Sequence, residues 1–179
     1  MKMPRLTTLA VTLALICGSV VIAHAQDNDG QKAITARVHG TFVDTAGGGG
    51  VLSGDMTVVR FEVRNGVVIA IGAIVGALAD SAGNVLGAVD QELALQVGNI
   101  ASTCNQLRMD LAATDAEVLQ TLVHFDKEVA GFDSRDGTTP KALAVLCTTS
   151  TLLRDTPTPD ALAQALNDVA AAMAAKPVR

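Results

Sequence analysis

The sequence VVRFEVRNGVVIAIGAIVGALA, residues 58–79, carries the clearest indication of the fold. Apolar and charged residues alternate from residue 59 to residue 64, which is the period-two pattern of a half-buried strand. Asn65-Gly66 follows and favours a type I′ turn, because both central residues of that turn take positive φ. We therefore expect an antiparallel hairpin. The predicted inward residues are Val59, Phe61 and Val63, and the predicted outward residues are Arg60, Glu62 and Arg64.

A two-residue turn also fixes the register of the hairpin. The expected cross-strand pairs are Arg64 with Val67, Val63 with Val68, Phe61 with Ala70, and Val59 with Gly72. The small residues of the second strand then leave room for the larger side chains of the first.

The second strand of this hairpin, residues 67–79, is apolar on both faces. Gly72 and Gly76 form a G-x-x-x-G pattern that also occurs where membrane helices pair, but thirteen residues are too few for a helix to span a bilayer. The stems of the charged residues on the first strand can shield only the first half of the outer face. We expect barrel closure or a second subunit to cover this face, because an exposed apolar strand promotes aggregation.

Further strands are predicted on both sides of the hairpin. Residues 46–50 form a flexible hairpin loop; they are not a phosphate-binding loop, because no Lys-Ser/Thr pair follows the glycines. The strand before this loop is the first of the chain, and the two hairpin strands are the second and third. A turn at residues 80–84 leads into a fourth strand, a fifth alternates over residues 107–111, and a last one covers residues 122–132. The predicted inward residues are Val85, Val89, Leu93, Leu95 and Val97 on the fourth strand, Leu107, Met109 and Leu111 on the fifth, and Val123, Phe125 and Val129 on the last.

The C-terminal part is predicted to be helical. Thr139-Pro140 and Thr158-Pro159 each resemble an N-cap followed by proline in the first turn. The inward stripes are Leu143, Leu146, Cys147 and Ser150 on the first helix and Leu162, Leu166, Val169 and Met173 on the second, with Asp160, Gln164, Asn167 and Asp168 opposite. Lys176 and Pro177 mark the end of the second helix. The predicted fold is mainly β (α+β): a curled or closed antiparallel sheet of about six strands with two C-terminal helices, about residues 139–176, packed on it.

The N-terminus has the layout of a cleavable signal peptide, residues 1–25: basic Lys2 and Arg5, an apolar stretch, and the small-x-small sequence Ala23-His24-Ala25. Cys17 suggests lipoprotein processing as an alternative, but the bulky Ile16 precedes it where a small residue is needed. We expect one extracytoplasmic domain, residues 26–179, secreted or periplasmic and without a transmembrane segment.

Composition narrows the partners of the mature chain. Without Lys2 and Arg5, 11 basic residues stand against 18 acidic ones, so nucleic acid is not an expected partner. Cys104 and Cys147 remain after cleavage, and an oxidising compartment favours a disulfide between them. Two buried thiols, or a bond to another chain, are the alternatives.

Four segments resemble a family of secreted bacterial proteins of unknown function. They are FEVRNG at residues 61–66, CNQLRMDL at 104–111, VHFD at 123–126 and ALAVLC at 142–147. The resemblance implies export and paired cysteines, and it transfers no activity. The chain departs from the family pattern at Ala73, Val75 and Ala77, where threonines are typical, and at Ala112-Ala113, where Gly-Pro is typical.

His124, Asp126 and Glu128 share one face of the predicted last strand and are the candidate metal ligands. A solvated polar face is the alternative interpretation, and we expect no metal or other cofactor. No nucleophile lies beside a histidine in the sequence, so we expect no enzyme. The predicted function is a non-enzymatic binding or structural module whose partner is a protein or an apolar small molecule. A carrier that encloses an apolar ligand in the curled sheet is the alternative, and a homo-oligomer is compatible with both.

We predict that the exported protein begins at Gln26, because the small residues Ala23 and Ala25 fit signal peptidase. The intact mass of the exported chain, with or without cyclisation of Gln26, checks this prediction. A mature chain that begins at a lipid-bearing Cys17 would contradict it.

Overall fold

A computed structural model describes residues 33–134 and 139–174. The predicted signal peptide and the helix stop at Lys176 and Pro177 lie outside these residues. The elements are β1 (Thr35–Val43), β2 (Gly49–Arg64), β3 (Val67–Ala79), β4 (Val85–Ser102), β5 (Gln106–Leu111), β6 (Thr114–Val118), β7 (Thr121–Phe125), β8 (Glu128–Asp133), α1 (Pro140–Leu152), a short 3₁₀ helix η1 (Leu153–Asp155) and α2 (Pro159–Ala174).

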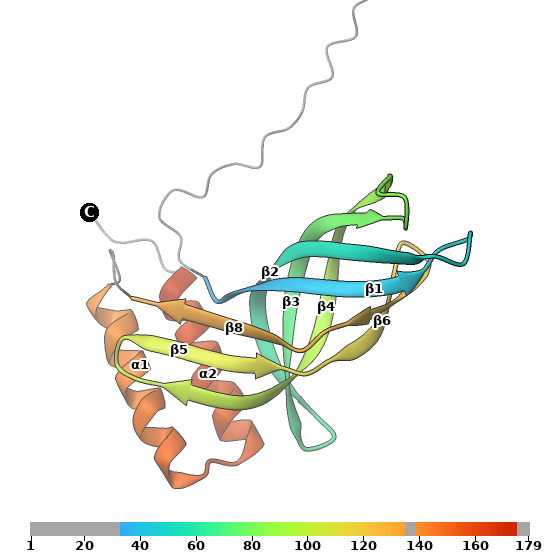
Figure 1. The fold of residues 1–179 in the computed structure, drawn as a ribbon. Coiled ribbons are helices and arrows are strands. Elements are labelled where there is room, and N and C mark those ends of the chain that lie inside the picture. The colour runs from blue at the N-terminus through green and yellow to red at the C-terminus, as the bar shows by residue number, and fades with distance from the viewer. Residues whose placement is uncertain (1–32, 135–138, 175–179) are drawn as a thin grey trace, which may run out of the picture.

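The strands form one antiparallel sheet that curls until its ends meet (Figure 1). Pairing runs from β2 through β3, β4, β5 and β8 to β1, and β1 pairs with β2 to close the barrel. β5 and β6 follow one another as a long strand with a break at Ala112-Ala113, and β7 and β8 do the same with a break at Asp126-Lys127. The barrel therefore has six strands, and the two C-terminal helices pack on it, which confirms the predicted fold class.

The β2–β3 hairpin forms as expected around Asn65 and Gly66, whose φ angles are 54° and 77°. The expected pairs of Arg64, Val63 and Phe61 are confirmed. The fourth pair is wrong, because a β-bulge between Val58 and Arg60 places Val58 opposite Gly72. Val59 consequently points outward and is 56% exposed.

Three glycines allow β2 and β3 to approach closely where the sheet curls. Gly54 lies directly opposite Gly76, and a Cβ atom on Gly76 would come within 2.4 Å of the Ser53 carbonyl oxygen. A Cβ atom on Gly72 would come within 2.6 Å of the Thr57 carbonyl oxygen. The G-x-x-x-G pattern thus serves a bend in a barrel strand and not a helix contact.

β1 covers only the first part of β2, and α2 covers the rest. The β1–β2 ladder ends at Thr57, and the half-buried Asn167 of α2 then contacts the backbone of Phe61. The Phe61 N–H donates to Asn167 Oδ1 at 2.7 Å, and Asn167 Nδ2 donates to the Phe61 carbonyl at 2.9 Å. One side-chain amide therefore replaces a neighbouring strand at this edge. The prediction that Asn167 belongs to the solvent face of its helix is wrong.

Both helices begin as predicted. The Thr139 hydroxyl accepts from the Ala142 N–H at 3.2 Å, and the Thr158 hydroxyl accepts from the Ala161 N–H at 3.3 Å. The predicted inward stripe of α1 is only partly confirmed: Leu146 is buried, but Leu143, Cys147 and Ser150 are half-buried. The other buried residues of α1 are Ala142 and Thr149. The predicted stripe of α2 packs into the barrel core through Leu166, Val169 and Met173.

Two strand irregularities and one loop boundary overturn further predictions. The register shift between Leu78 and Ala79 turns Val85 outward, where it is 71% exposed. The break before β8 turns Val129 outward and places Ala130 inside. The loop predicted for residues 46–50 ends sooner, because β2 already begins at Gly49.

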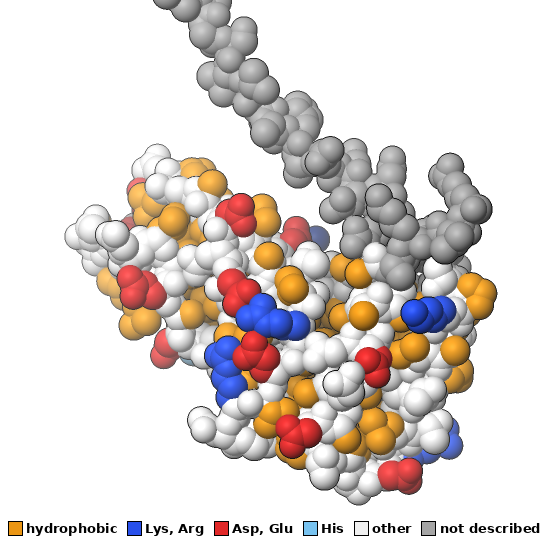
Figure 2. All heavy atoms as spheres, turned by 180° about the vertical axis from the view of Figure 1, so that it is seen from behind, with side chains coloured by type: hydrophobic (Ala, Val, Ile, Leu, Met, Phe, Trp, Pro, Cys, Tyr) orange, Lys and Arg blue, Asp and Glu red, His pale blue; other side chains and the backbone are white. Residues whose placement is uncertain are grey.

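The outer face of β3 is covered over its first half only. Ile71 is 1% exposed although it lies outside the core cluster. Its neighbour Arg60 on β2 reaches across β3 to Glu92 on β4, with an N–O distance of 2.9 Å. Glu62 joins Arg60 and Arg64 to this network, and oppositely charged side chains adjoin one another on the face shown in Figure 2. Val75, farther along the same face, is 62% exposed.

We predict that Ile71→Lys lowers the free energy of unfolding by about 3 kcal/mol or more, because it removes a buried side chain and places an ammonium beside Arg60. Val75→Lys on the same face is the matched control, with an expected change within about 0.5 kcal/mol. Urea unfolding of both variants measures the difference. Equal stability of the two variants would show that the outer face of Ile71 is solvated.

Asp44 ties together two turns at one end of the barrel. Its carboxylate accepts from the Ser81 hydroxyl and N–H of the β3–β4 turn and from the Gly48 and Ala46 N–H groups of its own turn. These hydrogen bonds lower the pKa of Asp44 to about 2, and the bond from the Ser81 hydroxyl has the largest effect.

Because the folded pKa of Asp44 lies below its ordinary value of 3.8, its stabilising effect is complete above about pH 4 and is lost as the pH falls toward 2. We predict that Asp44→Asn flattens the dependence of unfolding free energy on pH in that window. Asp126→Asn, an exposed carboxylate elsewhere, should leave the dependence unchanged. Identical pH profiles for Asp44→Asn and the parent chain would contradict the role of these bonds.

Candidate functional site

The barrel is incompletely closed between β4 and β6. β4 pairs with β3 along residues 85–96, but its ladder with β5 begins only at Val97. β6 pairs with β7 on one side and ends the sheet on the other. Residues 85–96 of β4 and residues 114–118 of β6 therefore present strand edges that lack a ladder partner within the part of the chain that the structure describes. We call this region the β4–β6 seam.

Three contacts cross or border the seam. At its closed end the Ala112 N–H donates to the Gln96 carbonyl at 2.9 Å. Farther along, Gln91 Nε2 donates to the Glu117 carbonyl at 3.0 Å. At the far end Leu119 lies against Gly87, where a Cβ atom would come within 2.7 Å of Leu119 Cδ1. Side chains, not backbone ladders, thus hold most of the seam together.

The direction of the free backbone groups follows from strand geometry. Both backbone groups of one residue in an antiparallel strand point to the same side, and successive residues alternate. Since the Gln96 carbonyl points into the seam and no register shift lies between Gly87 and Gln96, the N–H and C=O groups of Ala94, Glu92 and Asp90 also point there.

Carboxylates flank the seam on both sides. Asp90 and Glu92 lie on β4, and Asp115 and Glu117 lie on β6, all exposed. Glu92 is paired with Arg60, whose hydrogen bonds lower the pKa of this carboxyl. The Asp115 carboxylate accepts a hydrogen bond from His124 Nδ1 at 2.7 Å, and both side chains are exposed. Within the described ranges Asp90 and Glu117 have no side-chain hydrogen bond or ion pair.

The three candidate metal ligands do not form one group. The predicted continuous strand over residues 122–132 is wrong, because β7 ends at Phe125 and β8 begins at Glu128. His124 lies beside Asp115, whereas Glu128 lies 2.8 Å from His39 Nδ1 on β1. Among the described residues no three His, Cys, Asp or Glu side chains are grouped so that they could hold a metal ion.

His39 also lies on a shallow outer hollow of about 400 Å³ that spans β1, β2 and β3. Ser53 is directly opposite His39 in the β1–β2 register and lines the same hollow. The Glu128 carboxylate, the His39 imidazole and the Ser53 hydroxyl thus lie next to one another on β8, β1 and β2. This arrangement depends on the strand register, which the sequence does not reveal. The Ser53 hydroxyl makes no hydrogen bond to the imidazole in the described structure, and the absence of enzymatic activity stays a prediction.

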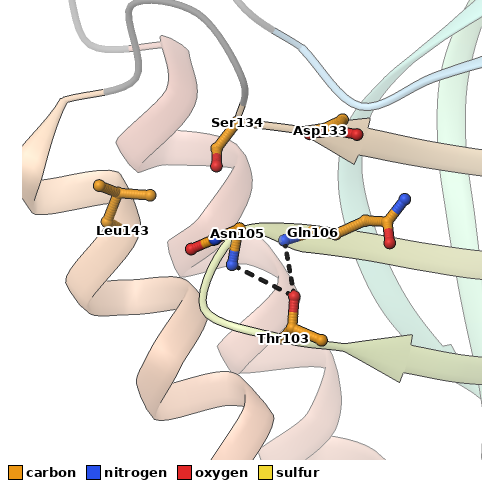
Figure 3. A pocket seen from close by; sticks show the side chains of 6 residues that line it. All are labelled: Thr103, Asn105, Gln106, Asp133, Ser134 and Leu143. Carbon is orange, nitrogen blue, oxygen red and sulfur yellow. Dashed lines mark hydrogen bonds between the residues drawn. The ribbon is translucent and has the colours of Figure 1, made fainter.

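A disulfide joins Cys104, in the β4–β5 turn, to Cys147 of α1, as predicted from the cysteine count and the expected compartment. The Ser150 hydroxyl donates to the Ser102 carbonyl beside it at 3.0 Å. A pocket of about 510 Å³ lies next to this junction (Figure 3). Its lining residues are Thr103, Asn105, Gln106, Asp133, Ser134 and Leu143. The Thr103 hydroxyl accepts from the backbone N–H groups of Asn105 and Gln106, so this polar group of the pocket shapes the turn.

The inward side chains of the barrel pack with the helices into one buried cluster. Met56, Ile74 and Phe125, for example, are at most 1% exposed. The carrier alternative, which requires room for an apolar ligand among such side chains, stays a prediction. No helix in the described ranges combines the length and the apolar character needed to cross a bilayer.

We predict that removing the disulfide lowers the free energy of unfolding by up to about 4 kcal/mol, because Cys104 and Cys147 are 43 positions apart and their bond restricts the unfolded chain. Urea unfolding with and without reductant measures the loss. The double variant Cys104→Ser/Cys147→Ser is the control, and reductant should not change its midpoint. A parent chain whose midpoint is equally insensitive to reductant would contradict the prediction.

No protein-family model, curated protein or solved structure matches this chain. The resemblance to secreted bacterial proteins therefore stays a prediction. The geometry of the described residues is the basis for the functional proposal.

Proposed function

We propose that the protein is a secreted or periplasmic, non-enzymatic binding module that takes up an extended chain segment at the β4–β6 seam. The observation that carries this proposal is the pair of strand edges without a ladder partner among the described residues. Such edges present rows of N–H and C=O groups that an added strand can pair with. The predicted signal peptide and the disulfide support a location outside the cytoplasm.

The form of the seam supports reversible binding. The Gln91 side chain occupies it with one hydrogen bond to the Glu117 carbonyl, and a side chain can rotate away without disrupting the β3–β4 ladder. An incoming strand would replace that single bond with several backbone bonds. The disulfide, the two helices and the β5–β8 ladder hold the rest of the barrel in place while the seam is occupied.

An apolar carrier is the second candidate, and one observation favours it. The buried side chains of Val89 and Leu93 flank Gln91 on the inner side of β4, so movement of Gln91 would connect the seam with the barrel interior. Mass spectrometry of organic extracts from native and recombinant protein tests this candidate. Clean extracts from both sources would reject it.

Hydrogen exchange tests the strand-binding proposal. Three soluble eleven-residue peptides with alternating valines differ only in the intervening residue, which is lysine, serine or glutamate. At least one peptide should slow exchange at the seam-facing amides of Asp90, Glu92 and Ala94. The amides of Leu93 and Leu95, which face β3, are the internal control and should not change. If no peptide protects the seam-facing amides, the proposed function is wrong.

A further inference from the structure

We infer that the segment bound in the β4–β6 seam is a basic extended peptide of a partner protein, with lysine or arginine at alternate positions. This inference rests on the proposed function and adds the chemistry of the partner. Its basis is the charge distribution along the two free edges.

The seam has an excess of negative charge. Asp90 and Glu117 lack a charged partner within the described part of the chain, and they lie on opposite sides of the seam. Arg60, which pairs with Glu92 on β4, also binds Glu62. An added acidic strand would meet like charges on both flanks, whereas a basic strand would pair with them.

The spacing of these carboxylates fits the period of a strand. Asp90 and Glu92 are two residues apart on β4, and Asp115 and Glu117 are two residues apart on β6. An extended chain between them presents every second side chain to the same face. Alternate lysines on that face would therefore come near carboxylates from both edges, while the intervening side chains would face Val89 and Leu93.

A second copy of this chain fits the seam less well. The charged residues of β4 and β6 are all acidic, and two of them, Glu92 and Asp115, are already paired within the same copy. Edge-to-edge pairing of two copies would therefore bring Asp90 and Glu117 toward like charges. The partner is therefore expected to be a different, basic chain.

The test measures the affinity of the full mature chain for the lysine-valine, serine-valine and glutamate-valine peptides by titration calorimetry at low and high salt. The lysine-valine peptide should bind at least tenfold more tightly than the other two, and its affinity should fall with salt. N-methylation of alternate amides on this peptide, which removes ladder donors and keeps the charge, should abolish binding.

Charge reversal identifies the site. Asp90→Lys and Glu117→Lys should each weaken binding of the lysine-valine peptide about tenfold, whereas Asp126→Lys, an exposed carboxylate between β7 and β8, should not. Circular dichroism of each variant confirms that it folds. Equal protection of the seam by all three peptides would overturn the basic partner and leave the proposed function standing. No protection by any peptide, or a mature chain that is already dimeric with its seam amides protected, would overturn the inference.

Discussion

The structure depends on one constraint: each backbone N–H and C=O group along a curled sheet needs a partner, and six strands of unequal length cannot supply all of them. β2 extends beyond β1 at one side of the barrel, and β4 extends beyond β5 at another. At both places a side-chain amide bonds to backbone groups that have no neighbouring strand in the described part of the chain. Asn167 accepts from and donates to Phe61, and Gln91 donates to the Glu117 carbonyl.

The two side-chain amides differ in how firmly they are held, and in the proposed function this difference separates stability from binding. Asn167 belongs to a helix that is packed into the core through Leu166 and Val169, so its amide is held in position. Gln91 lies on the unpaired edge of β4 itself, and its side chain makes a single hydrogen bond across the seam. The backbone groups of the first edge are therefore paired as part of the fold, whereas the proposed function assigns the second edge to an added strand. The disulfide and the Ser150 hydrogen bond fix α1 to the β4–β5 turn.

The sequence predicts what local rules control. The Asn65-Gly66 turn, the threonine caps and the inward stripe of α2 each depend on a few neighbouring residues. The disulfide was predictable because the expected signal-peptide cleavage leaves only two cysteines to pair. The predicted fold class follows from these elements because hairpin strands that are apolar on their inner face must bury that face against another element, here the facing strands and the two helices.

The remaining features depend on contacts between distant residues. A bulge at Val59 and a break at Asp126-Lys127 reverse the direction of the side chains that follow, and alternation alone does not locate either irregularity. The β6–β7 turn uses Leu119 and Gln120 at φ 48° and 64°, positions where glycine or asparagine would have signalled a turn. The seam arises from unequal strand lengths, and the partners of Gln91 and Asn167 are 26 and 106 positions away.

Hydrogen exchange at the Phe61 amide shows whether the Asn167 side chain completes this strand edge. In the parent chain this amide should exchange as slowly as the neighbouring ladder amides. In Asn167→Ala it should exchange about tenfold faster or more, because the N–H loses its acceptor, while the amide of Val63 on the same strand changes less. Unchanged exchange at Phe61 in the variant would show that the edge does not depend on Asn167 and would contradict the account.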